Sequence, residues 1–358
     1  VLKKIGLSAE MNWRDLLLED RRMREAMLWE DAGENKVHCF LCRHHCRIAD
    51  GSVGICQVRE NQGGRLYSLV YDKVIAQNID PVEKKPLYHF LPGSKTYSIA
   101  TPGCNFRCQF CQNADIAQMP KDSKVVLGQS VSPQEIVDEA LRAGCKSISY
   151  TYTEPTIFFE LAYDTAVLAH ENGLKNIFVT NGYITEEALR EIAPYLDAAN
   201  IDLKGFTPEF YRKVCGAELE GVLESIKLYH ELGIWTEITT LIIPGHNDSK
   251  NELHKIAHFI STIDRDIPWH VTRFHPTYKL TDQPSTPVAT LRMAMLAGFE
   301  EGLRYVYEGN IPGTGGEETY CPGCRRLLIK RYGFQVSDVD VRHGHCCFCG
   351  HLIAGVWG

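Results

Sequence analysis

The chain has 358 residues and a formal net charge of −7 at pH 7. This length allows one large domain with smaller additions, because a single hydrophobic core stops growing at about 250 to 300 residues. The acidic balance argues against nucleic acid as a partner, and no apolar run approaches the roughly 20 residues of a membrane helix. The 14 cysteines occur in clusters, which indicates metal or redox chemistry in the cytoplasm rather than disulfides.

The N-terminal part contains one helical pattern and one cysteine set. Apolar residues at near-helical spacing predict an amphipathic helix over 12–30. A set of four cysteines that could close around a metal follows: Cys39, Cys42, Cys46 and Cys56. Thiolate ligation suits zinc, which we favour here, but it also suits an iron–sulfur cluster. Residues 66–76 alternate like a strand, and the proline-rich stretch 80–93 predicts a connecting loop.

From residue 97 onward, strand-like runs alternate with helical patterns. The expected strands cover 97–100, 147–151, 176–180, 198–202, 236–242 and 270–274. The expected helices cover 133–143, 157–172, 186–196, 219–232, 251–263 and 288–302. Such alternation predicts an α/β fold with a parallel sheet, curled into a partial (β/α)6 TIM-like barrel. We therefore expect an N-terminal cysteine module with linker (1–92), the barrel (93–312) and a C-terminal module (313–358).

The stretch 101–113, directly after the first strand of the barrel, carries the most informative motif. Cys104, Cys108 and Cys111 are spaced to reach one metal centre, yet they leave it one ligand short. A structural zinc site and an ordinary 4Fe-4S cluster both take four protein ligands. The motif therefore predicts a 4Fe-4S cluster with one iron open to another molecule. The alternative is a zinc site whose fourth ligand comes from elsewhere.

Polar side chains follow several of the expected strands. They occur within 152–155, 180–182, 202–205, 244–248 and 273–276. The carboxyl ends of parallel strands share one edge of a sheet, where ligands bind in such folds. Together these groups predict a polar rim around the open cluster, suited to a charged, hydroxyl-rich cofactor.

Two Cys-x2-Cys pairs lie near the end of the sequence. They consist of Cys321, Cys324, Cys346 and Cys349. Each pair can present two thiolates to one tetrahedral ion, which predicts a zinc-ribbon-like structural site. Cys347 and His351 are further possible ligands in this region, whereas Cys145 and Cys215 stand apart and are interpreted as small buried apolar residues.

These motifs together resemble the radical S-adenosylmethionine (SAM) family that includes pyruvate formate-lyase activating enzymes, and within it the AmmeMemoRadiSam system radical SAM enzymes. The resemblance runs nearly from end to end. It rests on the first cysteine module, residues 80–86, 102–113, 152–155, 200–204 and 309–313, and the terminal cysteine pairs. It implies that Cys104, Cys108 and Cys111 hold the cluster. It also implies a set of SAM contacts, with Phe110 near the adenine: Phe110, Glu154, Asn181, Asp202, Lys204 and His275.

The activity implied by this resemblance is reductive cleavage of SAM to a 5'-deoxyadenosyl radical, fed by a low-potential donor of the flavodoxin or ferredoxin type. An activating enzyme would use this anaerobic chemistry to take hydrogen from a glycine of a partner protein. The two extra cysteine modules favour a protein or peptide substrate, because rigid metal-braced surfaces are suitable for docking. Radical modification of a small molecule is the alternative. A further alternative is that the chain is not an enzyme but an iron–sulfur or zinc module for binding or electron transfer.

Overall fold

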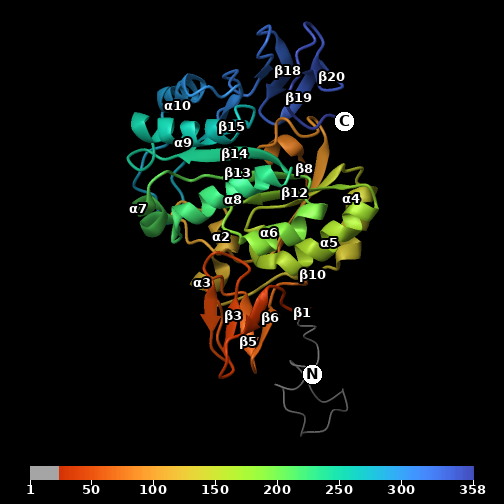
Figure 1. The fold of residues 1–358 in the computed structure, drawn as a ribbon, viewed down its shortest axis with the longest axis vertical. Coiled ribbons are helices and arrows are strands. Elements are labelled where there is room, and N and C mark those ends of the chain that lie inside the picture. The colour runs from red at the N-terminus through yellow and green to blue at the C-terminus, as the bar shows by residue number, and fades with distance from the viewer. Residues whose placement is uncertain (1–23) are drawn as a thin grey trace, which may run out of the picture.

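The computed structural model describes residues 24–358, and its centre is an eight-stranded sheet (Figure 1). Its strands are β8 (Ala76–Pro81), β9 (Lys95–Ala100), β11 (Ser147–Tyr150), β12 (Lys175–Thr180), β13 (Ala198–Asp202), β14 (Trp235–Ile242), β15 (Trp269–Arg273) and β16 (Val306–Gly309). The order across the sheet is β16-β15-β14-β13-β12-β11-β9-β8. All neighbours from β9 to β16 run parallel, and β8 pairs antiparallel with β9. The carboxyl ends of the parallel strands therefore meet at one edge.

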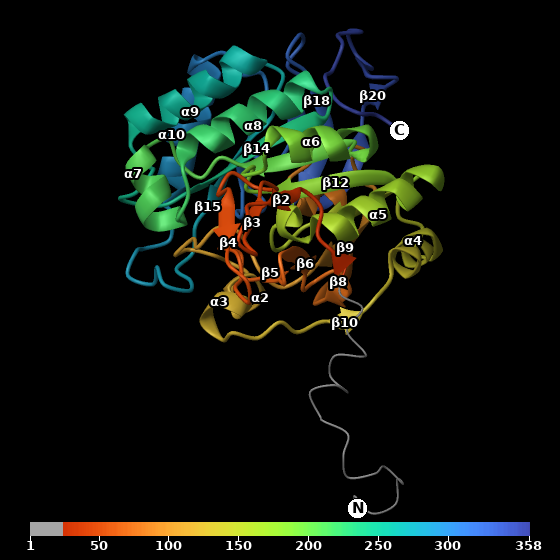
Figure 2. The ribbon, with the colours of Figure 1, turned by 60° about the horizontal axis from the view of Figure 1, so that its bottom comes forward.

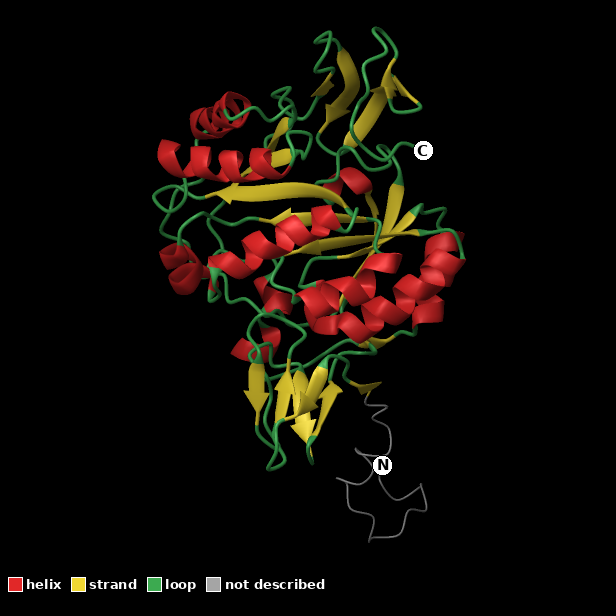
Figure 3. Ribbon diagram, viewed as in Figure 1, coloured by secondary structure: helices red, strands yellow, loops and turns green. Residues whose placement is uncertain are grey.

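Helices connect the parallel strands, as the alternating pattern predicted. The main ones are α4 (Pro133–Arg142), α5 (Phe159–Glu171), α6 (Glu186–Ile192), α8 (Leu219–Glu231), α9 (Lys250–Ile263) and α10 (Val288–Glu300). Helices α4, α5, α8 and α10 pack directly on strands of the sheet (Figure 3). Shorter helices are η1 (Val82–Lys84), α2 (Ala114–Ala117), α3 (Met119–Asp122), η2 (Pro155–Phe158), η3 (Ala193–Tyr195), α7 (Pro208–Phe210) and η4 (Tyr211–Cys215).

The sheet is larger than the six-stranded barrel that the sequence predicted. All six expected strands are present, but β16 adds a further parallel strand and β8 an antiparallel one. Strand β8 also precedes residue 93, where the barrel was expected to begin. The two edge strands, β8 and β16, do not pair with each other in the described part of the chain, so the sheet is open.

The N-terminal module consists of small antiparallel sheets. One has the order β1-β6-β5 and the other β2-β3-β4. Their strands are β1 (Arg24–Glu25), β2 (Trp29–Asp31), β3 (Val37–Cys39), β4 (Cys46–Ile48), β5 (Arg59–Gln62) and β6 (Arg65–Ser68). The expected helix over 12–30 is wrong for residues 24–30, which contain β1 and most of β2, and 12–23 fall outside the described residues. Pairing of Trp29 with Cys39 across a hairpin overrides the local helical periodicity.

The stretch expected as one strand over 66–76 is divided between several elements. It contains the end of β6, the short strand β7 (Lys73–Val74) and the start of β8. Strand β7 pairs with β10 (Gln129–Ser130), far along the chain. Residues 80–93 are mostly loop, as predicted, apart from the end of β8 and η1.

The C-terminal module lies on the opposite side of the main sheet from the N-terminal module (Figures 1 and 2). It contains β17 (Thr319–Tyr320), β18 (Leu327–Tyr332), β19 (Gln335–Val339), β20 (Val341–Arg342) and β21 (His345–Cys346). The buried Arg331 guanidinium donates hydrogen bonds to the Tyr88 carbonyl oxygen at 2.7 Å and to Thr319 Oγ1 at 2.7 Å. This arginine fixes the module to the loop before β9. Among the described helices, none has the length and apolar character needed to cross a membrane.

Candidate functional site

The three-cysteine loop leaves the carboxyl end of β9 and opens into a cavity. Cys104, Cys108 and Cys111 line this cavity, which has a volume of about 510 Å³. Phe110, between the second and third cysteines, lines it too and is 4 % exposed. The structure therefore brings the three thiols together at the edge of the sheet where the sequence placed the site.

Backbone and lysine hydrogen bonds hold the cysteine loop in place. The amides of Arg107 and Gln109 donate to the carbonyl oxygens of Cys215 (2.8 Å) and Val214 (3.0 Å), which belong to η4. Lys121 on α3 donates through Nζ to the Cys104 carbonyl oxygen at 2.6 Å. The loop is thus fixed by η4, which is distant from it in sequence, and by α3, which follows it closely along the chain.

The thiols lie where a free thiolate is unfavourable. Burial raises the pKa of Cys104 and raises that of Cys111 to about 11. Contact with the Cys215 thiol, together with burial, raises the pKa of Cys108. A bound metal supplies the positive charge that stabilises such thiolates, so the three side chains fit a metal cluster better than an isolated thiol function.

Glu154 and Asn181 form a connected wall beside the thiols. The Glu154 carboxylate is buried and accepts hydrogen bonds from the Asn181 amide at 2.8 Å and from Thr180 Oγ1 at 2.7 Å. Asn181 Nδ2 in turn donates to Asn105 Oδ1 at 2.7 Å. Glu154 therefore joins the ends of β11 and β12, and it connects them through Asn181 to the cysteine loop. Burial raises the pKa of Glu154.

Asp202 and Lys204 lie on the same wall, at the end of β13. Lys204 Nζ donates to Asp202 Oδ2 at 2.7 Å and lies 5.9 Å from the centre of the Phe110 ring. Burial alone would lower the pKa of Lys204, but the neighbouring Asp202 carboxylate outweighs it and raises the pKa. Asp202 is the more exposed partner, with 36 % of its side chain accessible against 14 % for Lys204. The pair presents both charges to the cavity.

His275, the remaining residue expected near SAM, is not among the residues that line the cavity. Its side chain is exposed, and its Nδ1 lies 3.1 Å from Ser285 Oγ. The preceding residue, Phe274, is fully buried. Successive side chains of an extended segment point to opposite sides, so burial of Phe274 directs His275 away from the interior.

The structure adds to the cavity two residues that the sequence did not assign, Lys84 and Lys85. They lie beside Tyr152 of the predicted polar rim, and Asp80 connects all three. The Asp80 carboxylate accepts hydrogen bonds from Lys84 at 2.9 Å, from Lys85 at 2.7 Å and from the Tyr152 hydroxyl. Burial lowers the pKa of Lys85 to about 8. The sequence signal for these residues was two adjacent lysines in a proline-rich loop. The pairing of β8 with β9 is what places this loop at the site, and it depends on the tertiary structure.

Residues 98–260 match the sequence pattern of the radical SAM superfamily. The chain is 51 % identical over 334 residues to "Uncharacterized protein MJ0808" of Methanocaldococcus jannaschii, covering 92 % of this chain and 99 % of that protein. The chain belongs to the radical SAM superfamily. This confirms the resemblance, and the radical SAM domain implies a 4Fe-4S cluster and SAM as cofactors.

More distant proteins match parts of this radical SAM chain. The pyruvate formate-lyase-activating enzyme of Clostridium pasteurianum is 25 % identical over 178 residues, which cover 48 % of this chain and 71 % of that enzyme. A solved domain of the pyruvate-formate lyase-activating enzyme from Bacteroides vulgatus has a TM-score of 0.42 and 17 % identity, over 46 % of this chain and 99 % of that one.

The C-terminal cysteines of this radical SAM protein have a different geometry. Cys321 Sγ lies 3.6 Å from Cys349 Sγ, and Cys324 Sγ lies 3.8 Å from Cys346 Sγ. All four sulfur atoms are within 4.8 Å of one another. A tetrahedral ion with bonds of about 2.3 Å to sulfur separates its ligands by roughly 3.8 Å. The four side chains therefore fit one metal ion, and neither Cys347 nor His351 belongs to the set.

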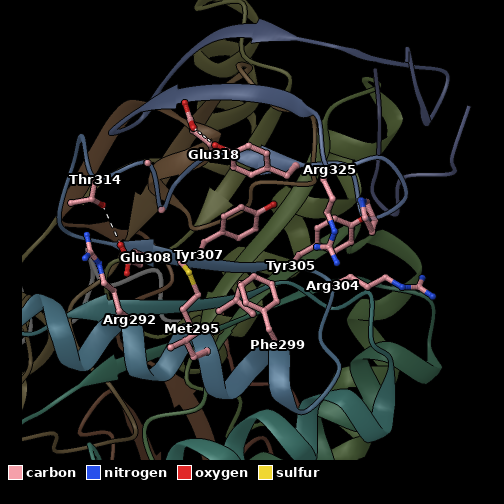
Figure 4. A pocket seen from close by; sticks show the side chains of 16 residues that line it. Arg292, Met295, Phe299, Arg304, Tyr305, Tyr307, Glu308, Thr314, Glu318 and Arg325 are labelled. Atoms are coloured by element: carbon pink, nitrogen blue, oxygen red, sulfur yellow. Dashed lines mark hydrogen bonds between the residues drawn. The ribbon is translucent and has the colours of Figure 1, made fainter. Parts of the chain in front are cut away.

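A second large cavity, of about 590 Å³, lies apart from the radical SAM cavity. Figure 4 shows Arg292, Met295 and Phe299 projecting into it from α10. Tyr307 and Glu308 of β16 line it from the sheet, and the Glu308 carboxylate accepts a hydrogen bond from Thr314. Among the described residues that line this cavity there is no cysteine, so they offer no thiolate to a metal.

Proposed function

We propose that Cys104, Cys108 and Cys111 hold a 4Fe-4S cluster with one iron open to SAM, and that the chain cleaves SAM reductively. The bound cofactors supply the one-electron chemistry, which converts SAM to methionine and a 5'-deoxyadenosyl radical. One observation carries the proposal: in the described part of the chain, three thiols and no fourth line the 510 Å³ cavity, beside a wall of polar side chains.

The residues on this wall suit the chemistry of SAM. We assign the Asp202 carboxylate to the hydroxyl or ammonium groups of SAM, and Lys204 to its carboxylate. Phe110 offers an apolar face for the adenine. Glu154 and Asn181 act by positioning, because the internal hydrogen bonds of Glu154 fix Asn181 against the cysteine loop.

We propose a protein or peptide as the substrate. Phe334, from the turn between β18 and β19, lines the cavity together with Asn310, which follows β16. Phe334 is 46 % exposed, so the C-terminal module presents an accessible aromatic side chain at the rim. Exposed aromatic side chains beside a cavity are suited to binding a peptide segment. The substrate would then contact both the sheet and the C-terminal module.

The decisive experiment is anaerobic reconstitution with iron and sulfide, followed by reduction in the presence of SAM. We expect 5'-deoxyadenosine to form with the parent chain and not with a variant in which Cys104, Cys108 and Cys111 are all alanine. A fully loaded, reduced parent that binds no SAM and forms no 5'-deoxyadenosine would contradict the radical SAM assignment. It would favour an electron-transfer module instead.

The substrate proposal has its own test. An anaerobic cell extract is divided by size, and each fraction is added to reduced enzyme and SAM. We expect turnover above the background to follow the macromolecular fraction. Turnover that follows only the small-molecule fraction would contradict a protein or peptide substrate.

A small-molecule substrate is the second candidate, and the lysines of the cavity favour it. Lys84 and Lys85 could bind an anionic group there. Since the pKa of Lys85 is lowered to about 8, the lysine loses its positive charge as the pH rises through that value. Binding of an anionic substrate should therefore weaken above about pH 8 and stay constant below about pH 7.

A further inference from the structure

The N-terminal module gathers four cysteines around one small cavity. Cys39 at the end of β3 pairs directly with Cys46 at the start of β4. Cys42 lies in the turn between them, and Cys56 comes from the next turn of the chain. All four line the same cavity. Folding thus brings together thiols that are separated by up to 17 residues (56 − 39).

The spacing of these sulfur atoms differs from that of a single-ion site. Among residues 24–358, the C-terminal set alone has its sulfur atoms all within 4.8 Å of one another. A zinc ion would require the N-terminal thiols to close to roughly 3.8 Å, as the C-terminal thiols already do. An iron–sulfur cluster spreads its thiolates further apart, because they bind different iron atoms.

Arg59 provides a second, independent observation. Its side chain is 2 % exposed and lines the cavity with the cysteines. Its Nη2 donates to the Met27 carbonyl oxygen and forms an ion pair with Glu160 Oε1 at 3.0 Å. Its Nε and Nη1 are buried and have no hydrogen-bond partner within the described residues. Buried donors are normally satisfied, and the sulfides and thiolates of a cluster are acceptors.

We infer that Cys39, Cys42, Cys46 and Cys56 hold an iron–sulfur cluster, a centre separate from the one proposed at Cys104. The unpaired Arg59 donors serve its sulfur atoms. The cavity is small, about 10 Å³. This is roughly one water-sized sphere. A two-iron cluster therefore displaces the thiols less than a four-iron cluster does.

The test uses the full chain with Cys104, Cys108 and Cys111 replaced by alanine, reconstituted anaerobically with iron and sulfide. We expect two or four iron atoms per chain, a matching amount of acid-labile sulfide, and a cluster signal in Mössbauer spectra. One iron or none, without sulfide, would overturn the inference, as would a second zinc equivalent in place of iron. Because the central cysteines are absent, this result does not depend on the proposed radical chemistry.

Further variants in the same background identify the ligands. Cys39→Ser and Cys56→Ser should lose the iron and sulfide, whereas Cys145→Ala, which removes a cysteine outside the cavity, should retain them. Iron that persists in both serine variants would contradict the ligand assignment. Circular dichroism checks that each variant is folded.

The role of Arg59 is tested by Arg59→Lys, which keeps the charge but removes the Nε and Nη1 donors. Fewer hydrogen bonds to sulfur should lower the midpoint potential of the remaining cluster. An unchanged potential and unchanged Mössbauer parameters in the folded variant would remove Arg59 from the site.

Discussion

The central and C-terminal sites are both built from cysteines, but they differ in how many thiols they contain and in the space beside them. The C-terminal site has four sulfur atoms within 4.8 Å of one another, which is a complete ligand set for one ion. The central site has three thiols on the wall of a 510 Å³ cavity. A complete set leaves no position for a substrate, whereas an incomplete set beside a cavity does. The comparison shows that the missing ligand and the adjacent space, rather than the cysteines alone, distinguish a reactive centre.

The two sites also differ in what surrounds them. Glu154 and Asn181 connect the central loop to two strand ends, so the site is part of the main sheet. The C-terminal site lies in a small module that is attached to the loop before β9 through Arg331. Substitutions in the central site should therefore abolish SAM cleavage. Substitutions in the C-terminal site should mainly destabilise the C-terminal module.

The largest effect is expected from the central ligands. Cys108→Ser should abolish detectable SAM cleavage and reduce the iron content, because the remaining thiols hold a cluster poorly. The zinc content of the chain should not change. Measurement of 5'-deoxyadenosine, iron and zinc checks this, with Cys145→Ala as the control. Equal loss of zinc and iron would mean that the two sites are not independent.

The next effect concerns the C-terminal site, which we propose binds zinc. Cys321→Ser should lose one zinc equivalent per chain and make residues after about 313 sensitive to protease, since such ligand sets fold with their metal. SAM cleavage should fall by less than about tenfold, because none of these four cysteines lines the central cavity and Phe334 alone, among the described residues of the C-terminal module, does. Cys347→Ser, outside the set, is the matched control. Unchanged zinc content in Cys321→Ser would contradict the site.

A smaller effect is expected at the cofactor wall. Asp202→Asn should weaken SAM binding by about 10- to 100-fold, because a hydrogen bond to a charged group contributes about 1.5 to 3 kcal/mol. Iron content should stay the same. Asp197→Asn is a suitable control, since Asp197 also pairs with a lysine, Lys175 at 2.7 Å, but does not line the cavity. Equal SAM affinity in both variants would remove Asp202 from the site.

The smallest effect is expected at His275. His275→Ala should change SAM affinity by less than about twofold, because this exposed side chain does not line the cavity. Equilibrium binding of SAM to the reconstituted protein measures it. A loss as large as that of Asp202→Asn would show that the loop after β15 moves inward when SAM binds.

Much of the fold was readable from local patterns. The alternation of period-two and helical runs predicted six parallel strands and their connecting helices, because each pattern records which face of an element is buried. The spacing of Cys104, Cys108 and Cys111 predicted a common centre, since close sequence neighbours in one loop cannot lie far apart. For the same reason the two Cys-x2-Cys pairs indicated a metal site.

The tertiary structure alone decided the features that depend on distant partners. Strand β16 is four residues long and is defined by its pairing with β15. The region around Trp29 became a strand because its hairpin partner outweighs helical periodicity. Lys85 lies at the cavity because β8 and the Asp80 carboxylate hold it there. Cys215, in η4, contacts Cys108. His275 points away from the interior because Phe274 is buried. Sequence periodicity records local burial, whereas these placements follow from pairing and packing between segments far apart in the chain.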